Sequence, residues 1–126
     1  MNVQPFRPLP GSGILYHYTT RAWAQEISMT GEILPISGYV YLTDVLFKIG
    51  WQATDYLALP NTNAEMAIPI STTILEHLGL QYLGVVPEWQ ARGGRSMRRG
   101  GGHQWVVSQP IPVQILPWTW IELESP

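Results

Sequence analysis

The sequence predicts a single α+β domain. Its 126 residues are 45% hydrophobic and 13% charged, a balance typical of a compact globular chain and opposite to that of a disordered one. Patterns of helical spacing fall in the first two thirds of the chain, whereas the last third holds three strand-like runs separated by prolines, at 103–108, 111–116 and 118–123. Helices early and strands late favour an α+β fold over an alternating parallel sheet.

The domain is expected to span residues 14–126, after an irregular N-terminal arm over residues 1–13. Three prolines and two glycines interrupt any regular element in that arm. Residues 14–18 then predict a first strand, and either Thr19 or Thr20 is a suitable N-cap for a short helix over about 21–30. Gly31 is a natural C-terminal stop for this helix.

The remaining elements follow from the same local signals. We expect a short extended piece at 32–34, a strand at 39–43, a helix within 46–58, and a strand at 64–70 in which Pro69 indicates an edge or a strand end. Ser71 is placed to cap a short helix over 71–77. The glycine- and arginine-rich stretch 92–102 predicts a mobile loop, and Trp105, Trp118 and Trp120 are expected to pack in the core.

Composition and charge exclude several classes of protein. There are no cysteines, so disulfides and cysteine-ligated metals are excluded, and the three histidines at 17, 77 and 103 lack the spacing of a metal site. The net charge of −2 gives no global field for nucleic acid. No apolar run is long enough to span a bilayer and no signal peptide is evident, so we expect a cytoplasmic protein without membrane partners.

The first strand raises a question about His17. Alternation places Tyr16 and Tyr18 on one face, and Leu15, His17 and Thr19 on the other. A ring that both donates and accepts hydrogen bonds therefore sits beside a leucine, where burial without a partner is costly. One interpretation is a core histidine satisfied by a backbone carbonyl. The other is a functional imidazole at a binding site.

The order of features beyond this strand resembles a known family. LYHYTT, an amphipathic helix, GEILP, VYLTD and the C-terminal QWVVSQPIPVQIL occur in the order and at the spacing of small ADP-ribosyltransferase-like domains of the diphtheria-toxin and poly(ADP-ribose) polymerase type, particularly their bacterial toxin and phage branch. The match covers about residues 14–44 and 103–116. The resemblance implies split, twisted β-sheets flanking a cleft that binds NAD, with short helices.

The resemblance also implies the site residues. His17 matches the family's first signature residue, which hydrogen-bonds a ribose of NAD, and Tyr41 matches the tyrosine that stacks on nicotinamide. Tyr18, Thr19 and Thr43, near the strand ends, are further candidates for cofactor contacts. An imidazole suits a hydroxyl and a backbone group at once, and an aromatic face attracts a cationic ring by roughly 1–2 kcal/mol when desolvated. Sheet packing alone is the competing interpretation of Tyr41.

The third signature position departs from the family. Where its members usually carry a glutamate, this chain has Gln104, next to His103. A glutamine keeps a hydrogen bond to the sugar but supplies no negative charge, and one well-placed group in such sites contributes roughly 10²–10³ in rate. Three explanations are open: an active variant without the carboxylate, a degenerate member that only binds, or an inactivating substitution. Glu88 and Asp44 are possible substitutes, although a solvated loop residue and a helix cap explain them equally well.

Four of the seven basic residues lie within eight positions, as Arg92, Arg95, Arg98 and Arg99. Guanidinium groups bind phosphates bidentately, so these side chains are candidate substrate-binding residues. They would suit a relative of the NAD-consuming enzymes that remove a 2′-phosphate from RNA. A flexible, soluble connection between strands is the alternative explanation, since a lone glycine-rich loop is weak evidence for phosphate binding.

We therefore expect an NAD-dependent transferase that passes ADP-ribose to a protein or nucleic-acid acceptor, with His17, Tyr41 and Gln104 as catalytic candidates and no metal. The start at Met1 favours a free-standing effector, such as a toxin with a cognate antitoxin or immunity protein, or a phage-encoded modifier. The alternatives are a catalytically inactive module that binds a nucleotide, ADP-ribose or a partner protein, and an RNA 2′-phosphotransferase-like enzyme. A general interaction protein whose motifs are accidental belongs to a different class.

Overall fold

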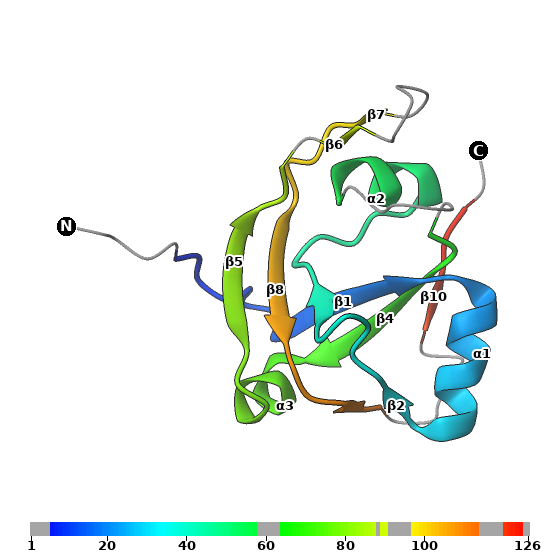
Figure 1. Cartoon of the computed structure of the whole chain (residues 1–126), viewed down its shortest axis with the longest axis vertical. Helices are drawn as coiled ribbons and strands as arrows, with labels where there is room; N and C mark the ends of the chain where they lie inside the picture. The colour runs from blue at the N-terminus through cyan, green and yellow to red at the C-terminus, as the bar shows by residue number, and fades with distance from the viewer. Residues whose placement is uncertain (1–5, 58–63, 88, 91–96, 114–119, 125–126) are drawn as a thin grey trace.

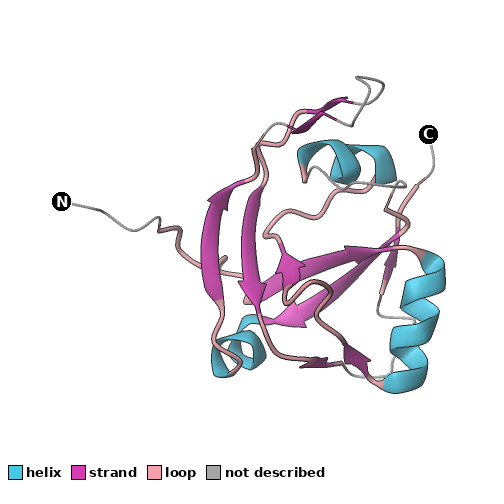
Figure 2. Cartoon of the chain, in the orientation of Figure 1, coloured by secondary structure: helices cyan, strands magenta, loops and turns pink. Residues whose placement is uncertain are grey.

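The computed structural model describes residues 6–57, 64–87, 89–90, 97–113 and 120–124. It has a mixed α+β architecture in which antiparallel sheets dominate and the helices are short, as the sequence predicts (Figures 1 and 2). No helix in these ranges is long and apolar enough to cross a bilayer. Nor do these ranges contain a group of three histidine or carboxylate side chains that could hold a metal ion.

The first sheet has the strand order β1-β4-β10. It is built from β1 (Ile14–Thr19), β4 (Met66–Ser71) and β10 (Ile121–Glu122), all antiparallel to their neighbours. Strands β1 and β4 pair along their whole length, from Ile14 opposite Ser71 to Thr19 opposite Met66. β10 pairs with β4 only at Met66 and Ala67.

The second sheet has the order β3-β8-β5. It contains β3 (Val40–Leu42), β8 (His103–Val107) and β5 (Gln81–Val85). Two short pairs extend the fold: β2 (Glu32–Ile33) with β9 (Ile111–Pro112), and β6 (Trp89–Gln90) with β7 (Met97–Arg98). In Figure 1, β5 and β8 run across the direction of β1 and β4, so the two sheets are steeply inclined to one another.

Among the described residues, one bridge joins the two sheets. Tyr16 of β1 and Thr43, directly after β3, exchange both backbone hydrogen bonds, at 2.7 and 2.9 Å. Beyond this point β1 continues along β4 and β3 continues along β8, so the strands diverge. We call the wedge between them the fork.

Of the helices in the described residues, α1 and α3 are capped where the sequence predicts, and α2 lies within the predicted range 46–58. Thr20 caps α1 (Arg21–Thr30) by accepting from the Trp23 backbone N–H at 3.2 Å, and Gly31 ends it in the left-handed conformation. Helix α2 (Gly50–Tyr56) begins without a side-chain cap. Ser71 caps α3 (Thr72–His77).

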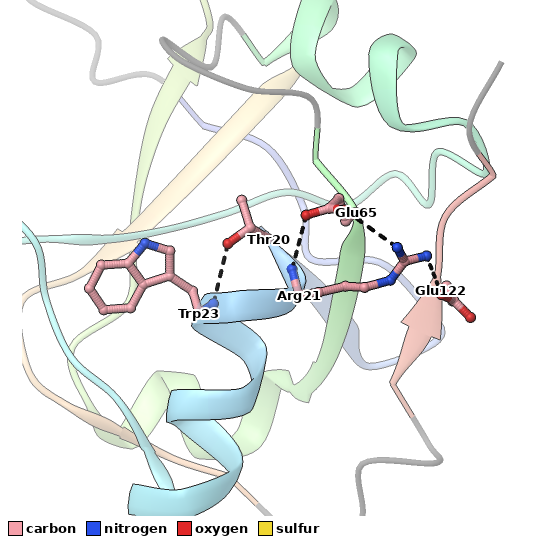
Figure 3. A network of polar contacts seen from close by, with 5 residues as sticks. All are labelled: Thr20, Arg21, Trp23, Glu65 and Glu122. Carbon is pink, nitrogen blue, oxygen red and sulfur yellow. Dashed lines mark hydrogen bonds and ion pairs between the residues drawn. The ribbon is translucent and has the colours of Figure 1, made fainter.

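An ion-pair network fixes the start of α1 against the first sheet (Figure 3). Glu65 accepts a hydrogen bond from the Arg21 backbone N–H at 3.2 Å and lies 3.5 Å from its guanidinium, which also pairs with Glu122 of β10. The Trp23 indole points away from this network, and more than half of its surface is exposed. The network joins α1, the chain just before β4, and β10.

Two hydrophobic clusters occupy opposite faces of β1. The larger one packs Leu15 with side chains of α1, α3 and both sheets, including Trp105 and Trp120. The smaller one contains Tyr18 and Ala53 of α2, with Tyr16 packed against it. The predicted alternation of β1 is therefore confirmed, and each face has its own core. Trp118 lies outside the described residues.

Two expectations about local structure need correction. β4 is the central strand of its sheet rather than an edge, yet Pro69 is tolerated because β10 pairs only with residues 66–67. A mobile loop throughout 92–102 is wrong for residues 97–102, where Met97–Arg98 forms β7. The glycines after it also pack closely: a Cβ at Gly100 would lie 2.3 Å from the Val86 carbonyl oxygen.

Candidate functional site

The side chain of His17 occupies the fork. Its Nδ1 lies 2.9 Å from the backbone carbonyl oxygen of Tyr41, on the strand that diverges from β1. Had the antiparallel ladder continued past the Tyr16–Thr43 bridge, Tyr18 would be the residue opposite Tyr41. The imidazole instead satisfies this carbonyl, at the position where the two sheets separate. The sequence left two interpretations of His17. The first, a histidine bonded to a backbone carbonyl, is correct for Nδ1 and says nothing of Nε2.

This hydrogen bond decides the protonation of the ring. A carbonyl oxygen only accepts, so Nδ1 carries the proton and Nε2 of the neutral ring is an acceptor. Within the part of the chain that the structure describes, Nε2 has no partner. Burial between the strands lowers the pKa of His17 below its ordinary 6.5, and the bond to Tyr41 opposes this only partly. At neutral pH His17 is therefore uncharged.

Tyr41 presents its ring to solvent. Its neighbours Val40 and Leu42 are buried in the larger cluster, whereas 48% of Tyr41 is exposed, as expected for the opposite face of the strand. Tyr39, two residues earlier and 45% exposed, lies on the same face, with ring centroids 6.3 Å apart and planes tilted by 58°. The competing interpretation of Tyr41 as a sheet-packing aromatic does not describe this exposed ring.

Gln104 lies on the same face of the second sheet as Tyr41. Tyr41 is directly opposite Val106, and Gln104 is two residues from Val106 along β8. Such diagonal neighbours have Cα atoms about 7–8 Å apart. Across β5, Gln104 is paired with Gly84, where a Cβ would meet nothing within 4 Å. Gln104 is half-buried, and the residue opposite it on β5 has open space where a side chain would be.

A β-bulge produces this opening. The register of β5 against β8 passes from Tyr82–Trp105 to Gly84–Gln104, so Leu83 is the extra residue. Gly84 has a φ of 102°, which side chains other than glycine rarely adopt. Bulges of this kind often re-aim a side chain next to a functional site.

His103 faces the opposite side of the sheet from Gln104. Its Nδ1 lies 2.6 Å from the Tyr82 hydroxyl, and its ring lies against that of Tyr82, which also contacts the buried Trp105. His103 therefore belongs to an aromatic group on the core side of β8.

Tyr18 and Thr43 form hydrogen bonds that stabilise the backbone around the fork. The Tyr18 hydroxyl donates to the Val45 carbonyl and accepts from the Phe47 N–H, both at 2.6 Å, and burial raises the pKa of its phenol. Thr43 is 1% exposed and donates to the His103 carbonyl at 2.7 Å. The side chains of both candidates for cofactor contact are therefore buried, and their hydroxyl groups bond the backbone. Thr19, half-buried at the end of β1, stays a prediction.

Asp44, one of the two possible substitutes for a catalytic carboxylate, is engaged by a basic side chain. Asp44 pairs with Arg7 of the N-terminal arm at 2.8 Å, and its side chain is only 10% exposed. Its Oδ1 is buried without a hydrogen-bond partner among the described residues. Glu88 lies outside those residues.

The structure describes only part of the arginine cluster. Arg92 and Arg95 lie outside the described residues, and for Arg98 the structure gives the backbone, in β7. Arg99 is exposed and paired: its side chain and its backbone N–H both contact Asp55, at 2.7 and 2.9 Å. Its guanidinium also lies 4.9 Å from the centre of the Tyr56 ring. Substrate binding by Arg99 stays a prediction, and it would compete with the pairing to Asp55.

Sequence reasoning missed two contributors to this face. Tyr39 shares the YVY alternation with Tyr41, and that spacing was sufficient to place both rings together. Gly84 interrupts the strand pattern QYLGVV, and an isolated glycine there is a bulge signal. Its position opposite Gln104 depends on the long-range pairing of β5 with β8.

Comparison with known proteins gives no family assignment. No protein-family model matches the chain, and no curated protein or solved structure matches it. What the site can do must therefore be argued from its own geometry.

Proposed function

We propose that the protein binds NAD at the fork and transfers its ADP-ribosyl group to a macromolecular acceptor. One observation carries the proposal: the His17 ring bonds the backbone carbonyl of Tyr41 in the fork, and the side chain of Tyr41 is exposed and shares its sheet face with Gln104. Separate segments of the chain, residues 14–19, 40–42 and 103–107, thereby contribute an acceptor nitrogen, an aromatic ring and an amide within one small region.

Each group suits one part of the dinucleotide. The unprotonated Nε2 of His17 accepts a hydrogen bond from a ribose hydroxyl. The exposed ring of Tyr41 offers its electron-rich face to the cationic nicotinamide. The amide of Gln104 can donate to or accept from the second ribose hydroxyl, and the space beside Gly84 leaves room for it.

The reaction would break the bond between nicotinamide and ribose and form a bond from the same ribose carbon to the acceptor. Positive charge develops on the sugar as nicotinamide leaves. Gln104 can orient the hydroxyl but cannot neutralise that charge, so we expect slow turnover and a gain of roughly 10²–10³-fold for Gln104→Glu.

A catalytically inert binding module is the second candidate. It is favoured by the same missing carboxylate, together with the engagement of Asp44 by Arg7. The RNA 2′-phosphotransferase alternative is less favoured, because the one fully described arginine of the cluster is occupied by Asp55.

Calorimetric titration of NAD and of ADP-ribose tests the binding step. We expect wild-type protein to bind NAD and His17→Ala to lose at least tenfold in affinity, whereas His77→Ala, at an exposed histidine of α3, binds like wild type. Equal affinities for all three proteins, or no binding by wild type, would refute the site.

An NAD-glycohydrolase assay then separates the two candidates. Activity that appears only in Gln104→Glu supports the inert module, and activity in wild type that rises in this variant supports the transferase. Gln25→Glu, at an exposed position of α1, controls for the added charge.

A further inference from the structure

Thr43 contacts two other strands at the point where β3 ends. Its backbone exchanges both hydrogen bonds with Tyr16 of β1, at 2.7 and 2.9 Å. Its hydroxyl donates to the backbone carbonyl of His103, the first residue of β8, at 2.7 Å. Because Thr43 is 1% exposed, water does not compete for these bonds. One buried residue therefore connects β1, β3 and β8.

The hydroxyl bond of Thr43 reaches a part of β8 that the backbone ladder does not. β3 pairs with β8 as far as Leu42, which lies opposite Trp105. His103 and Gln104 precede Trp105 in β8, so they lie beyond the last pair of this ladder. The Thr43 side chain thus supplies the contact that fixes the beginning of β8 from the β3 side.

The strand on the other side of Gln104 gives its side chain little support. Gln104 lies opposite Gly84 of β5, next to the shift in register. Glycine has no side chain that could pack against the amide, and a bulge locally disrupts the ladder. The position of the Gln104 amide therefore depends on how the backbone of residues 103–104 is held.

The bonds of Thr43 connect the two residues that precede the proposed ribose contacts. Tyr16 directly precedes His17, and His103 directly precedes Gln104. We propose that Thr43 is a positioning residue whose hydroxyl sets the place of Gln104 relative to His17. The inference rests on the proposed function, in which these two side chains bind the hydroxyls of one ribose. Thr43 is buried, so this role needs no contact with NAD.

The reaction makes this placement important. Groups that act on a reacting sugar must be held within about 0.5 Å of their productive position, and a misplacement of about 1 Å can cost roughly 10²-fold in rate. A glutamate at position 104 would take the same place on the backbone as the native glutamine. Its carboxylate would therefore depend on the Thr43 hydroxyl in the same way.

Three substitutions separate positioning from a loss of stability. Thr43→Val removes the hydroxyl and keeps the shape of the side chain, and Thr43→Ser keeps a hydroxyl. Thr54→Val is the matched control, because Thr54 of α2 is 2% exposed and its hydroxyl also bonds the backbone, at Gly50 and Ala64. Both valine variants should melt at a lower temperature than wild type, so all measurements are made below every transition.

NMR of the Gln104 side-chain amide tests the position without NAD. Its signals are assigned by their loss in Gln104→Glu. We expect Thr43→Val to shift or broaden them, whereas Thr43→Ser and Thr54→Val leave them close to their wild-type positions. Unchanged signals in Thr43→Val would overturn the inference. Should Thr43→Val fail to fold, Thr43→Ala removes the same donor and replaces it in each measurement.

The NAD-glycohydrolase kcat of Gln104→Glu tests the consequence for the reaction. Adding Thr43→Val to this variant should lower kcat at saturating NAD by roughly tenfold or more, whereas adding Thr43→Ser or Thr54→Val should change it by less than about threefold. A merely structural role predicts equal effects of Thr43→Val and Thr54→Val. Equal effects, or altered amide signals with an unaltered kcat, would also overturn the inference.

The two measurements fail separately. If no protein in the series binds or cleaves NAD, the proposed function fails, and the amide signals still decide whether Thr43 sets the position of Gln104. If Gln104→Glu cleaves NAD and Thr43→Val alters neither the rate nor the signals, the proposed function stands and the positioning role is refuted.

Discussion

At the residue scale, the two ring nitrogens of His17 have different environments. Nδ1 donates to the Tyr41 carbonyl and so satisfies a backbone group that the diverging strands leave without a ladder partner. This bond orients the ring and leaves Nε2 as an acceptor in the fork. Because the proposed function also uses this ring, replacing His17 should affect both the sheet and the binding of NAD.

The pKa of His17 makes stability depend on pH. Its folded pKa lies below the unfolded value of 6.5, so between these two values the unfolded chain binds more protons. Wild-type stability should therefore fall as pH is lowered through 6.5 and level off below the folded pKa. His17→Asn offers a side-chain N–H near the position of Nδ1 but does not titrate, so its free energy of unfolding should fall less between pH 7.5 and pH 5. Urea unfolding at several pH values measures this.

His77→Asn is the matched control for the pH series. His77 is exposed in the last turn of α3, and its replacement should preserve the wild-type pH dependence. Parallel curves for wild type and His17→Asn would contradict a lowered pKa at the fork.

Tyr18 gives a second test at this scale. Tyr18→Phe removes a hydroxyl that bonds the backbone of both Val45 and Phe47, and leaves the Phe47 N–H without its partner. We expect a loss of about 1–3 kcal/mol in the free energy of unfolding. Tyr16→Phe, on the same face of β1 and with no hydroxyl hydrogen bond within the described residues, should cost less than about 0.5 kcal/mol. Equal losses in the two variants would show that the hydroxyl bonds are not the cause.

At the element scale, local signals predicted the elements well and their pairing poorly. Thr20, Gly31 and Ser71 act where the sequence places them, because a cap depends on residues within one helical turn. The fork is different: it requires residue 16 to meet residue 43, and Tyr41 to meet Val106. No local pattern encodes such contacts, so the grouping of His17, Tyr41 and Gln104 came only from the resemblance, and Gly84 was missed.

The glycines at 100–102 show the same limit. Their sequence resembles that of a flexible loop. In the structure, however, the Gly100 N–H donates to the Asp55 carbonyl and the Gly102 N–H donates to the Tyr56 carbonyl. These two hydrogen bonds connect the end of α2 to the residues that precede β8. A Cβ at Gly100 would meet backbone atoms of Val86 and Pro87 at 2.3–2.7 Å, and φ is 67°. Close packing, rather than flexibility, therefore explains why glycine is needed there.

Gly100→Ala should consequently destabilise the protein strongly. The left-handed conformation alone costs roughly 1–2 kcal/mol for a residue with a Cβ, and displacing a backbone strand adds to this. We expect a loss of about 3 kcal/mol or more, or failure to fold. Gly11→Ala, where a Cβ meets nothing within 4 Å, should stay within about 0.5 kcal/mol in the same denaturation series. If both variants unfold at the same denaturant concentration, residues 100–102 do not pack as described.

At the scale of the whole molecule, the two sheets meet at the Tyr16–Thr43 bridge, and contacts between distant parts of the chain hold them in position. The N-terminal arm reaches Asp44 through Arg7, and β10 reaches α1 through Glu122 and Arg21. β10 pairs with β4 at only two positions, and the chain after it is also held by the buried Leu123, whose N–H donates to the Glu65 carbonyl, so the exposed ion pair adds to these contacts. Because α1 begins directly after the strand that carries His17, the attachment of β10 also supports the fork.

The Arg21–Glu122 pair should therefore couple residues that are 101 positions apart. Both side chains are more than half exposed, so a double-mutant cycle with Arg21→Gln and Glu122→Gln should give a coupling of only about 0.2–1 kcal/mol at low salt. The coupling should shrink at about 1 M salt, where the screening length is near 3 Å. Glu76→Gln, at an exposed carboxylate of α3, should be additive with Arg21→Gln under both conditions. A coupling that is absent at low salt would mean that backbone pairing and the burial of Leu123, rather than this ion pair, hold the strand in place.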